Sequence, residues 1–167
     1  MTSATALLDH LVRAGATLGC AESLTGGLLT STLVEVPGAS AAVRGGIVAY
    51  ATDVKIGVLG VAEDVVREHG VVSAACAAAM AESIRRVLRA DVGLATTGVA
   101  GPDPQEGRPV GEVFLGLALG EAVMTRRLQL AGDRGAIRES AVAEAIAWCT
   151  RELAGRSDAQ VGVGGPR

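Results

Sequence analysis

Apolar and polar positions divide the chain into short strand-like runs and longer helical patterns. Apolar residues recur every three or four positions in the helical segments, whereas each strand-like segment is a short, mostly apolar run. The pattern predicts strands at 16–21, 45–51, 91–98, 111–119 and 122–130, the last two joined by a tight hairpin. It predicts helices at about 4–14, 24–36, 73–89 and 134–153, and a segment at 53–70 that is helical in pieces. Ser73 and Asp133 have the side chains expected of N-caps.

The order of these elements favours an α/β fold. Helices and strands alternate through most of the chain and a hairpin follows, which predicts helices on both faces of a largely parallel sheet with one antiparallel strand. Ligands of such sheets bind at the carboxyl ends of the strands. Two strand ends carry polar turns, "CAESLTGG" from Cys20 and "ATTGVAGPD" from Ala95, and we expect them to meet in one crevice.

Length, composition and charge narrow the class of protein. A chain of 167 residues predicts one domain that buries roughly 70% of its unfolded surface. Hydrophobic residues make up 49% of the chain but aromatic residues only 2%, so the core must consist of small aliphatic side chains. This composition favours helices that pack closely on a sheet. The net charge of −3 argues against an electrostatic nucleic-acid surface.

The sequence shows no sign of membrane insertion or export. No apolar run reaches the ~20 residues that span a bilayer, and the first residues lack the basic start and apolar run of a signal peptide. Cys20, Cys76 and Cys149 form no CxxC pair, which favours a reduced cytoplasmic protein with buried thiols. We expect one domain at 1–153, a disordered Gly-rich tail at 154–167, and a homo-oligomer that binds neither nucleic acid nor membrane.

The turn "AESLTGG", residues 21–27, admits three interpretations: a phosphate cradle, a mount for a nucleophile, or only a capped helix. A P-loop needs a lysine after its last glycine, where this chain has Leu28, and no GxGxxG motif follows a strand. Ser23 or Thr25 could cap the following helix, and capping alone explains the turn about as well as a functional site does. Free N–H groups at such a turn would also stabilise an anion or an oxyanion.

Candidate bases for a nucleophile are scarce. The two histidines, His10 and His69, lie away from the strand ends, so we expect neither a Ser–His–Asp triad nor a metal site. Lys55 is the single lysine among 15 basic residues, and only a desolvated lysine, not an arginine, can become a neutral amine base. The only tyrosine, Tyr50, lies five residues earlier. A single lysine can survive by chance, but near Ser23 on an adjacent strand end it suggests a Ser–Tyr–Lys hydrolytic centre.

Six longer segments resemble one known family. They are "AESLTGG", "GGIVAYATDVKIGVLGV", "HGVVS", "TTGVAGP", "PVGEVFLGLA" and "GDRGAIRESAV", in this order over about residues 5–153. They resemble the CinA C-terminal domain family, which includes the nicotinamide-nucleotide amidohydrolases, or NMN deamidases. The resemblance implies a three-layer α/β/α fold with a mostly parallel, mixed sheet of about five strands. It also implies the stand-alone form of a domain that many CinA proteins carry behind an amino-terminal domain.

The same resemblance implies an activity and its residues. The activity is hydrolysis of nicotinamide mononucleotide to nicotinate mononucleotide and ammonia, without cofactor or metal. The family's catalytic positions map onto Ser23 as nucleophile and onto Tyr50 and Lys55 as its base system. Phosphate and oxyanion would be held by the polar turns, and the sequence leaves open which turn holds which. The expected substrate-binding residues are Glu22, Thr25, Gly26, Gly27, Thr97, Gly98, Gly101 and Arg134.

Two alternatives to this function remain at the level of sequence. One is a non-catalytic nucleotide-binding or interaction module, and the other is a Ser–Lys amidase for another amide. A departure from the family bears on the choice, because Asp53 stands where many relatives have Asn. Its charge is expected to raise the pKa of Lys55 and so weaken the lysine as a base.

Overall fold

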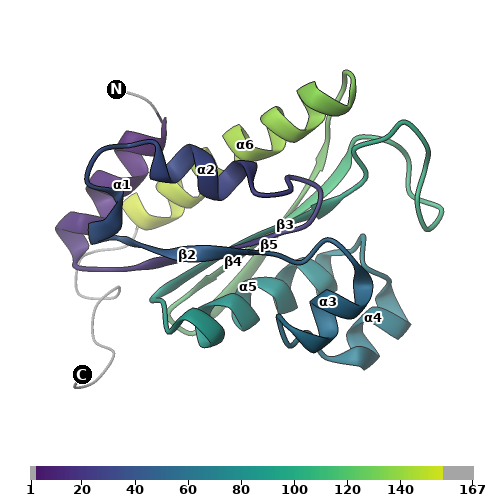
Figure 1. Cartoon of the computed structure of the whole chain (residues 1–167), viewed down its shortest axis with the longest axis horizontal. Helices are drawn as coiled ribbons and strands as arrows, with labels where there is room; N and C mark the ends of the chain where they lie inside the picture. Colours follow the sequence, from purple (N-terminus) through teal and green to yellow (C-terminus); the bar gives the residue numbers. More distant parts are fainter. Residues whose placement is uncertain (1–2, 156–167) are drawn as a thin grey trace.

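The computed structural model describes residues 3–155, and its five strands form one mixed sheet (Figure 1). The strands lie in the order β2-β1-β3-β4-β5. β1 pairs in parallel with β2 and β3, whereas β4 runs antiparallel to both of its neighbours. The predicted sheet with one antiparallel strand is therefore confirmed. The strands are β1 (Leu18–Glu22), β2 (Val43–Val48), β3 (Val92–Gly98), β4 (Glu112–Leu119) and β5 (Ala122–Gln129).

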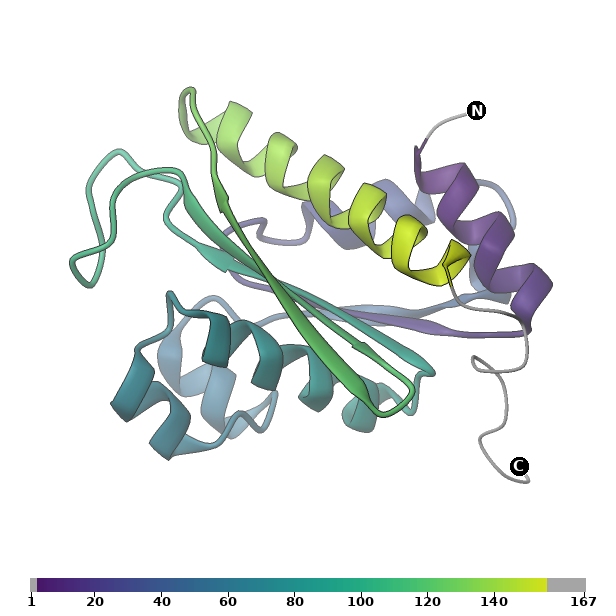
Figure 2. The same cartoon turned by 180° about the vertical axis from the view of Figure 1, so that it is seen from behind.

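Helices cover both faces of this sheet, as Figures 1 and 2 show from opposite sides. One face carries α1 (Ser3–Ala14), α2 (Leu28–Val34) and α6 (Arg134–Ala154). The other face carries α3 (Thr52–Gly57), α4 (Glu63–His69) and α5 (Ala74–Leu88), and a short 3₁₀ helix, Ala39–Ala41, precedes β2. Each layer encloses its own apolar cluster, built mainly from leucine, valine, isoleucine and alanine. The expected α/β/α architecture with a small-side-chain core is confirmed.

Both predicted N-caps are present. The hydroxyl of Ser73 accepts a hydrogen bond from the N–H of Cys76 at 3.0 Å, and α5 begins at the next residue. The carboxylate of Asp133 accepts one from the N–H of Ala136 at 2.9 Å, and α6 follows. These two side chains satisfy N–H groups that have no partner within the first turn of a helix, which is why the helices begin there.

Two of the element boundaries that differ from the prediction lie at the site described below. The helix expected from residue 24 begins at Leu28, because Gly26 and Gly27 adopt φ of 58° and 97° and the chain turns before it becomes helical. The strand expected at 45–51 ends at Val48, so Tyr50 lies in a loop beyond the sheet.

Close approach of α5 to the sheet explains how a core with few aromatic side chains is filled. A Cβ at Gly93 of β3 would lie 2.0 Å from the carbonyl oxygen of Ala81, and a Cβ at Gly116 of β4 would lie 2.0 Å from that of Ala77. Any side chain at these two glycines would push the helix away from the strands. At these two glycines the backbone of α5 packs directly against the backbone of the strands. The core is therefore densely packed although it contains few large side chains.

The carboxyl ends of β1, β2 and β3 lie at one edge of the sheet, since the three strands are parallel. The turns after them meet there, as the sequence predicts. Within residues 3–155, no helix is long and apolar enough to cross a membrane. The predicted disordered tail starts at Ala154, which is the last residue of α6, and positions 156–167 lie outside the described residues.

Candidate active site

The Ser23 turn follows β1 directly. The N–H of Ser23 donates to the carbonyl of Thr96 on β3 at 2.9 Å, so the pairing of the two strands extends one residue past β1. Ser23 is 9% exposed. Its hydroxyl is therefore fixed by the sheet and still open to the pocket described below.

The carboxylate of Glu22 fastens this turn to the first residues of α2. The side chain is completely buried, and a buried carboxylate is stable only when donors surround it. Oε2 accepts from Thr25 Oγ1 and from the N–H groups of Gly27 and Leu29, and Oε1 accepts from the N–H and Oγ1 of Thr30, at 2.6–3.0 Å. Glu22 thus does the capping that the sequence assigned to Ser23 or Thr25.

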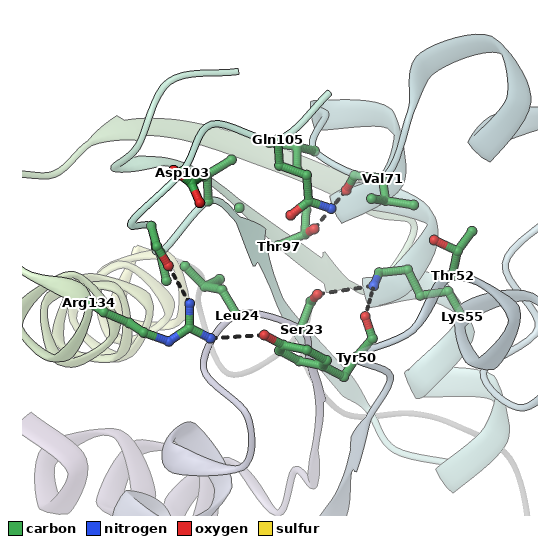
Figure 3. A pocket seen from close by; sticks show the side chains of 15 residues that line it. Ser23, Leu24, Tyr50, Thr52, Lys55, Val71, Thr97, Asp103, Gln105 and Arg134 are labelled. Atoms are coloured by element: carbon green, nitrogen blue, oxygen red, sulfur yellow. Dashed lines mark hydrogen bonds between the residues drawn. The ribbon is translucent and has the colours of Figure 1, made fainter. Parts of the chain in front are cut away.

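Lys55 reaches the same point from α3. Its side chain is 1% exposed, and Nζ lies 3.0 Å from Oγ of Ser23. The amine also donates to the main-chain carbonyl of Ala49 at 2.8 Å. A third bond, to the main-chain carbonyl of Tyr50 at 3.1 Å, is drawn in Figure 3 with the bond to Ser23. The structure therefore brings together Ser23 and Lys55, which are 32 positions apart in the sequence.

Burial lowers the pKa of Lys55 below its ordinary value of 10.5. The Cys76 thiol on α5 and the Glu106 carboxylate oppose part of this shift in the pKa. Asp53 does not contribute: its carboxylate is exposed and accepts from the N–H of Val54 at the start of α3. The expectation that Asp53 raises the pKa of Lys55 is therefore wrong, because helical geometry turns the two side chains apart.

Tyr50 lies at the mouth of the pocket. Its side chain is 59% exposed, and its hydroxyl accepts from Arg134 Nη2 at 2.9 Å (Figure 3). The tyrosine hydroxyl makes no hydrogen bond to Ser23 or Lys55, so its link to the lysine is the main-chain carbonyl. Arg134, the first residue of α6, also donates Nη1 to the carbonyl of Gly101. The arginine thus joins the loops that follow β2 and β3.

These side chains line a cavity of about 130 Å³. Of the residues predicted to bind substrate, Thr97, Gly98, Gly101 and Arg134 line it. Glu22, Thr25, Gly26 and Gly27 do not line it, and instead they build the turn behind Ser23. The full lining is Ser23, Leu24, Tyr50, Thr52, Lys55, Val71, Val72, Thr97, Gly98, Val99, Ala100, Gly101, Asp103, Gln105 and Arg134.

Arg138 is a residue of the site that the sequence analysis missed. From one turn further along α6 than Arg134, its Nε donates to the carbonyl of Leu24 at 3.1 Å and its Nη2 to that of Thr25 at 2.8 Å. Within residues 3–155, the N–H groups of Leu24 and Thr25 have no hydrogen-bond acceptor, whereas that of Gly26 donates to the carbonyl of Ser23. Leu24 lines the cavity and can offer its N–H to a ligand, whereas Thr25 is fully buried behind it. The signal in the sequence was the spacing of four between the two arginines, which places both on one helix face.

The described part of the chain contains no group of three or more His, Cys, Asp or Glu side chains that could hold a metal ion. Buried Cys76 lies near Lys55, and burial raises the pKa of its thiol to about 11. The chemistry available in the cavity is therefore that of a hydroxyl, a buried amine and main-chain N–H groups.

Comparison with known proteins shows which family of sequences this chain is similar to. The family model of the CinA C-terminal domain matches residues 1–153. A CinA-like protein of Frankia casuarinae is 52% identical over 155 residues, which is 93% of this chain and 36% of that protein. The chain spans about a third of the length of the curated relatives that it matches.

Solved structures of similar proteins have the same fold. A competence-damaged protein (CinA) superfamily protein of Klebsiella pneumoniae superimposes with a TM-score of 0.90 at 32% identity, over 92% of this chain and 97% of that one. A CinA superfamily protein of Escherichia coli gives a TM-score of 0.86 at 29% identity, over 91% of this chain and 88% of that one.

Proposed function

The chain belongs to the CinA C-terminal domain family, and from this premise we propose that it is an amidohydrolase that hydrolyses the carboxamide of nicotinamide mononucleotide. One observation carries the proposal: the amine of Lys55 is buried and lies 3.0 Å from the hydroxyl of Ser23. A neutral amine has two N–H groups and one lone pair. The carbonyls of Ala49 and Tyr50 accept the two N–H groups, which leaves the lone pair for the proton of Ser23.

Neutral Lys55 accepts the hydroxyl proton while Oγ of Ser23 bonds to the carboxamide carbon. The resulting tetrahedral intermediate collapses when protonated Lys55 gives its proton to the amide nitrogen, and ammonia leaves. An ester between Ser23 and the nicotinoyl group remains. A water molecule, deprotonated by Lys55, then cleaves this ester, and nicotinate mononucleotide is released with both groups restored.

The negative charge that develops on the carboxamide oxygen needs donors beside Ser23. We assign this role to the N–H group of Leu24, which lines the cavity and has no acceptor within residues 3–155. Arg138 holds the carbonyls of Leu24 and Thr25, the two peptides that follow, so it supports the turn that carries this N–H group before the substrate arrives.

The size and charge of the cavity support a ring-bearing amide. A volume of about 130 Å³ suits one six-membered ring, because an apolar cavity of roughly 150 Å³ holds benzene. The ribose phosphate would then lie outside, towards exposed Arg134 at the start of α6. Tyr50 and Asp103 at the mouth offer an aromatic face and a carboxylate to the cationic pyridinium ring.

The test is ammonia release from nicotinamide mononucleotide by the wild type and by Ser23→Ala, with Ser31→Ala as the matched control. Ser31 is exposed on α2, so its loss leaves the site intact. We expect wild type and Ser31→Ala to release ammonia, and Ser23→Ala to lose the activity while it still binds the nucleotide in calorimetry. Nicotinamide riboside should be a poorer substrate, because it lacks the phosphate.

Two results would contradict the proposal. Turnover retained by Ser23→Ala would exclude this serine as the nucleophile. Binding of the nucleotide without ammonia release by the wild type would instead favour a non-catalytic nucleotide-binding module.

A further inference from the structure

The loop between β3 and β4, residues 99–111, contains a strained turn next to the cavity. The main chains of Gln105 and Arg108 exchange two hydrogen bonds, at 2.8 Å and 3.2 Å. Between them Glu106 has φ of 52° and Gly107 has φ of 73°, the pattern of a type I′ turn. Asn, Asp or Gly adopts this conformation more readily than Glu does. A contact made by the Glu106 side chain must therefore compensate.

That contact is a clamp on the segment that precedes α5. Oε2 of Glu106 accepts from the N–H groups of Val71 at 2.9 Å and Val72 at 3.1 Å. The carboxylate also fits closely against Gly70, where a Cβ would lie 2.7 Å from Oε2. A single carboxylate oxygen thus binds two consecutive main-chain donors of a segment 34 positions away.

The two segments joined in this way both contribute walls of the cavity. Val71 and Val72 line it from the segment before α5, and Asp103 and Gln105 line it from the loop. In Figure 3 the side chain of Gln105 extends from the loop towards Thr97, which donates its hydroxyl to the carbonyl of Val71 at 2.7 Å. The position of the loop therefore decides whether the walls enclose the reacting groups.

The same carboxylate is one of the charged groups near Lys55. Ser23, directly after β1, is hydrogen-bonded to the amine, and the Cys76 thiol on α5 and the Glu106 carboxylate act on the amine electrostatically. Asp103 and Arg134 line the cavity further from it, and the exposed carboxylate of Asp53 bonds to its own helix. Of the carboxylates, Glu106 is the one that favours the protonated form of Lys55.

We propose that Glu106 is a positioning residue of this site: its carboxylate clamps loop 99–111 onto Gly70–Val72, holds together two walls of the cavity that contains Ser23 and Lys55, and adds a negative charge to the surroundings of the amine. The inference rests on the proposed amidohydrolase function, since it concerns how the base and the cavity of that reaction are held. It assigns a role to a residue that neither touches the reacting atoms nor lines the cavity.

Two substitutions separate the clamp from the charge. In Glu106→Gln the amide oxygen can replace Oε2 and accept both N–H groups, so the clamp stays and the charge is lost. In Glu106→Ala both are lost. We expect Glu106→Ala to raise KM for nicotinamide mononucleotide about tenfold, and Glu106→Gln to recover most of that loss. Glu121→Ala and Glu121→Gln, exposed at the hairpin between β4 and β5 at the other end of the sheet, are the matched controls.

A second measurement, the titration of Lys55 by NMR, does not depend on activity and is possible because the chain has a single lysine. Protein labelled with ¹³C-lysine gives one lysine spectrum, that of Lys55, whose titration can be followed directly by NMR. Loss of a negative charge disfavours the protonated amine, so Lys55 of Glu106→Gln should titrate at lower pH than the wild type, and kcat/KM should begin to rise at lower pH. Glu121→Gln should leave both curves unchanged.

Either of two results would overturn the proposal. The first is an equal KM for Glu106→Ala and Glu121→Ala, because it would show that Glu106 does not act as a clamp. The second is a Lys55 titration in Glu106→Gln that is the same as in the wild type. If neither the wild type nor any variant releases ammonia, the proposed function is wrong. The NMR titration of Lys55 then still decides whether Glu106 acts on the amine.

Discussion

At the residue scale, the chemistry of the site depends on how completely Lys55 is kept from water. An exposed lysine is protonated at neutral pH and cannot accept a proton from a serine. Here the side chain is 1% exposed, and burial lowers the pKa of the amine from its usual 10.5. The sequence identified this lysine as a candidate base because it is the only one, whereas its burial on α3 beside Ser23 comes from the tertiary structure.

A pH profile tests the base role of Lys55. Activity should rise with pH as the amine loses its proton, and because burial lowers the pKa of Lys55, the rise should come below pH 10.5. Lys55→Arg keeps the charge but cannot release a proton, so it should be nearly inactive from about pH 6 to about pH 9. The measurement is kcat/KM against pH for both proteins.

A second variant guards against misfolding of Lys55→Arg in a buried position. Lys55→Met has similar length and no charge, so it should fold, by circular dichroism, and still be inactive at every pH. If either folded variant retained more than about a tenth of wild-type turnover, a loss under ~1.4 kcal/mol, Lys55 would not be the base.

At the element scale, α6 holds the turn that carries Ser23. Arg138 binds the carbonyls of Leu24 and Thr25 in one fork, which a lysine or an alanine cannot reproduce. Arg138→Ala should therefore lower kcat at least about tenfold with a small change in KM, because the turn that carries Ser23 and the oxyanion donor loses its support. Arg151→Ala, exposed in the last turn of the same helix, should change neither parameter. An unchanged kcat in Arg138→Ala would show that the turn holds its shape without the arginine.

The contact between α5 and the sheet makes a prediction about stability. In Gly93→Ala the new methyl would lie 2.0 Å from the carbonyl of Ala81, so helix and strand must separate. We expect the free energy of unfolding in urea to fall by about 3 kcal/mol. Gly57→Ala at the end of α3, where no atom lies within 4 Å of the added methyl, should be neutral or slightly stabilising. Equal stability of the two variants would mean that the layers can shift apart at little cost.

At the scale of the whole molecule, the three thiols report on the integrity of both layers. Cys20, Cys76 and Cys149 are all buried. Burial raises the pKa of Cys76 to about 11 and that of Cys149 to about 12, and it raises the pKa of Cys20 as well. At neutral pH the reactive thiolate is therefore scarce, in addition to being shielded.

A thiol reagent such as DTNB should thus label the folded protein at least about a hundredfold more slowly than the unfolded chain. In concentrated urea all three thiols should react. Rapid labelling of one thiol in the native protein would reveal local opening of the layer that contains it.

The sequence by itself determined the order of the elements, the class of sheet, the caps at Ser73 and Asp133, and the candidates Ser23 and Lys55. Periodicity and capping are visible in a short window of sequence, and the rarity of a residue type is visible in a count over the whole chain. Even so, sequence alone could not say whether the "AESLTGG" turn was a site or only a helix cap.

Only the tertiary structure decided how the site is held. It gave the capping role to Glu22, turned Asp53 away from Lys55, placed the Tyr50 hydroxyl on Arg134, and brought Arg138 to the turn at Leu24 and Thr25. Each of these outcomes depends on the direction of a side chain or on a contact between distant segments. The physical reason is that the pKa of a group and its hydrogen bonds depend on its neighbours in space. In the folded chain these neighbours come from segments that are far apart in the sequence.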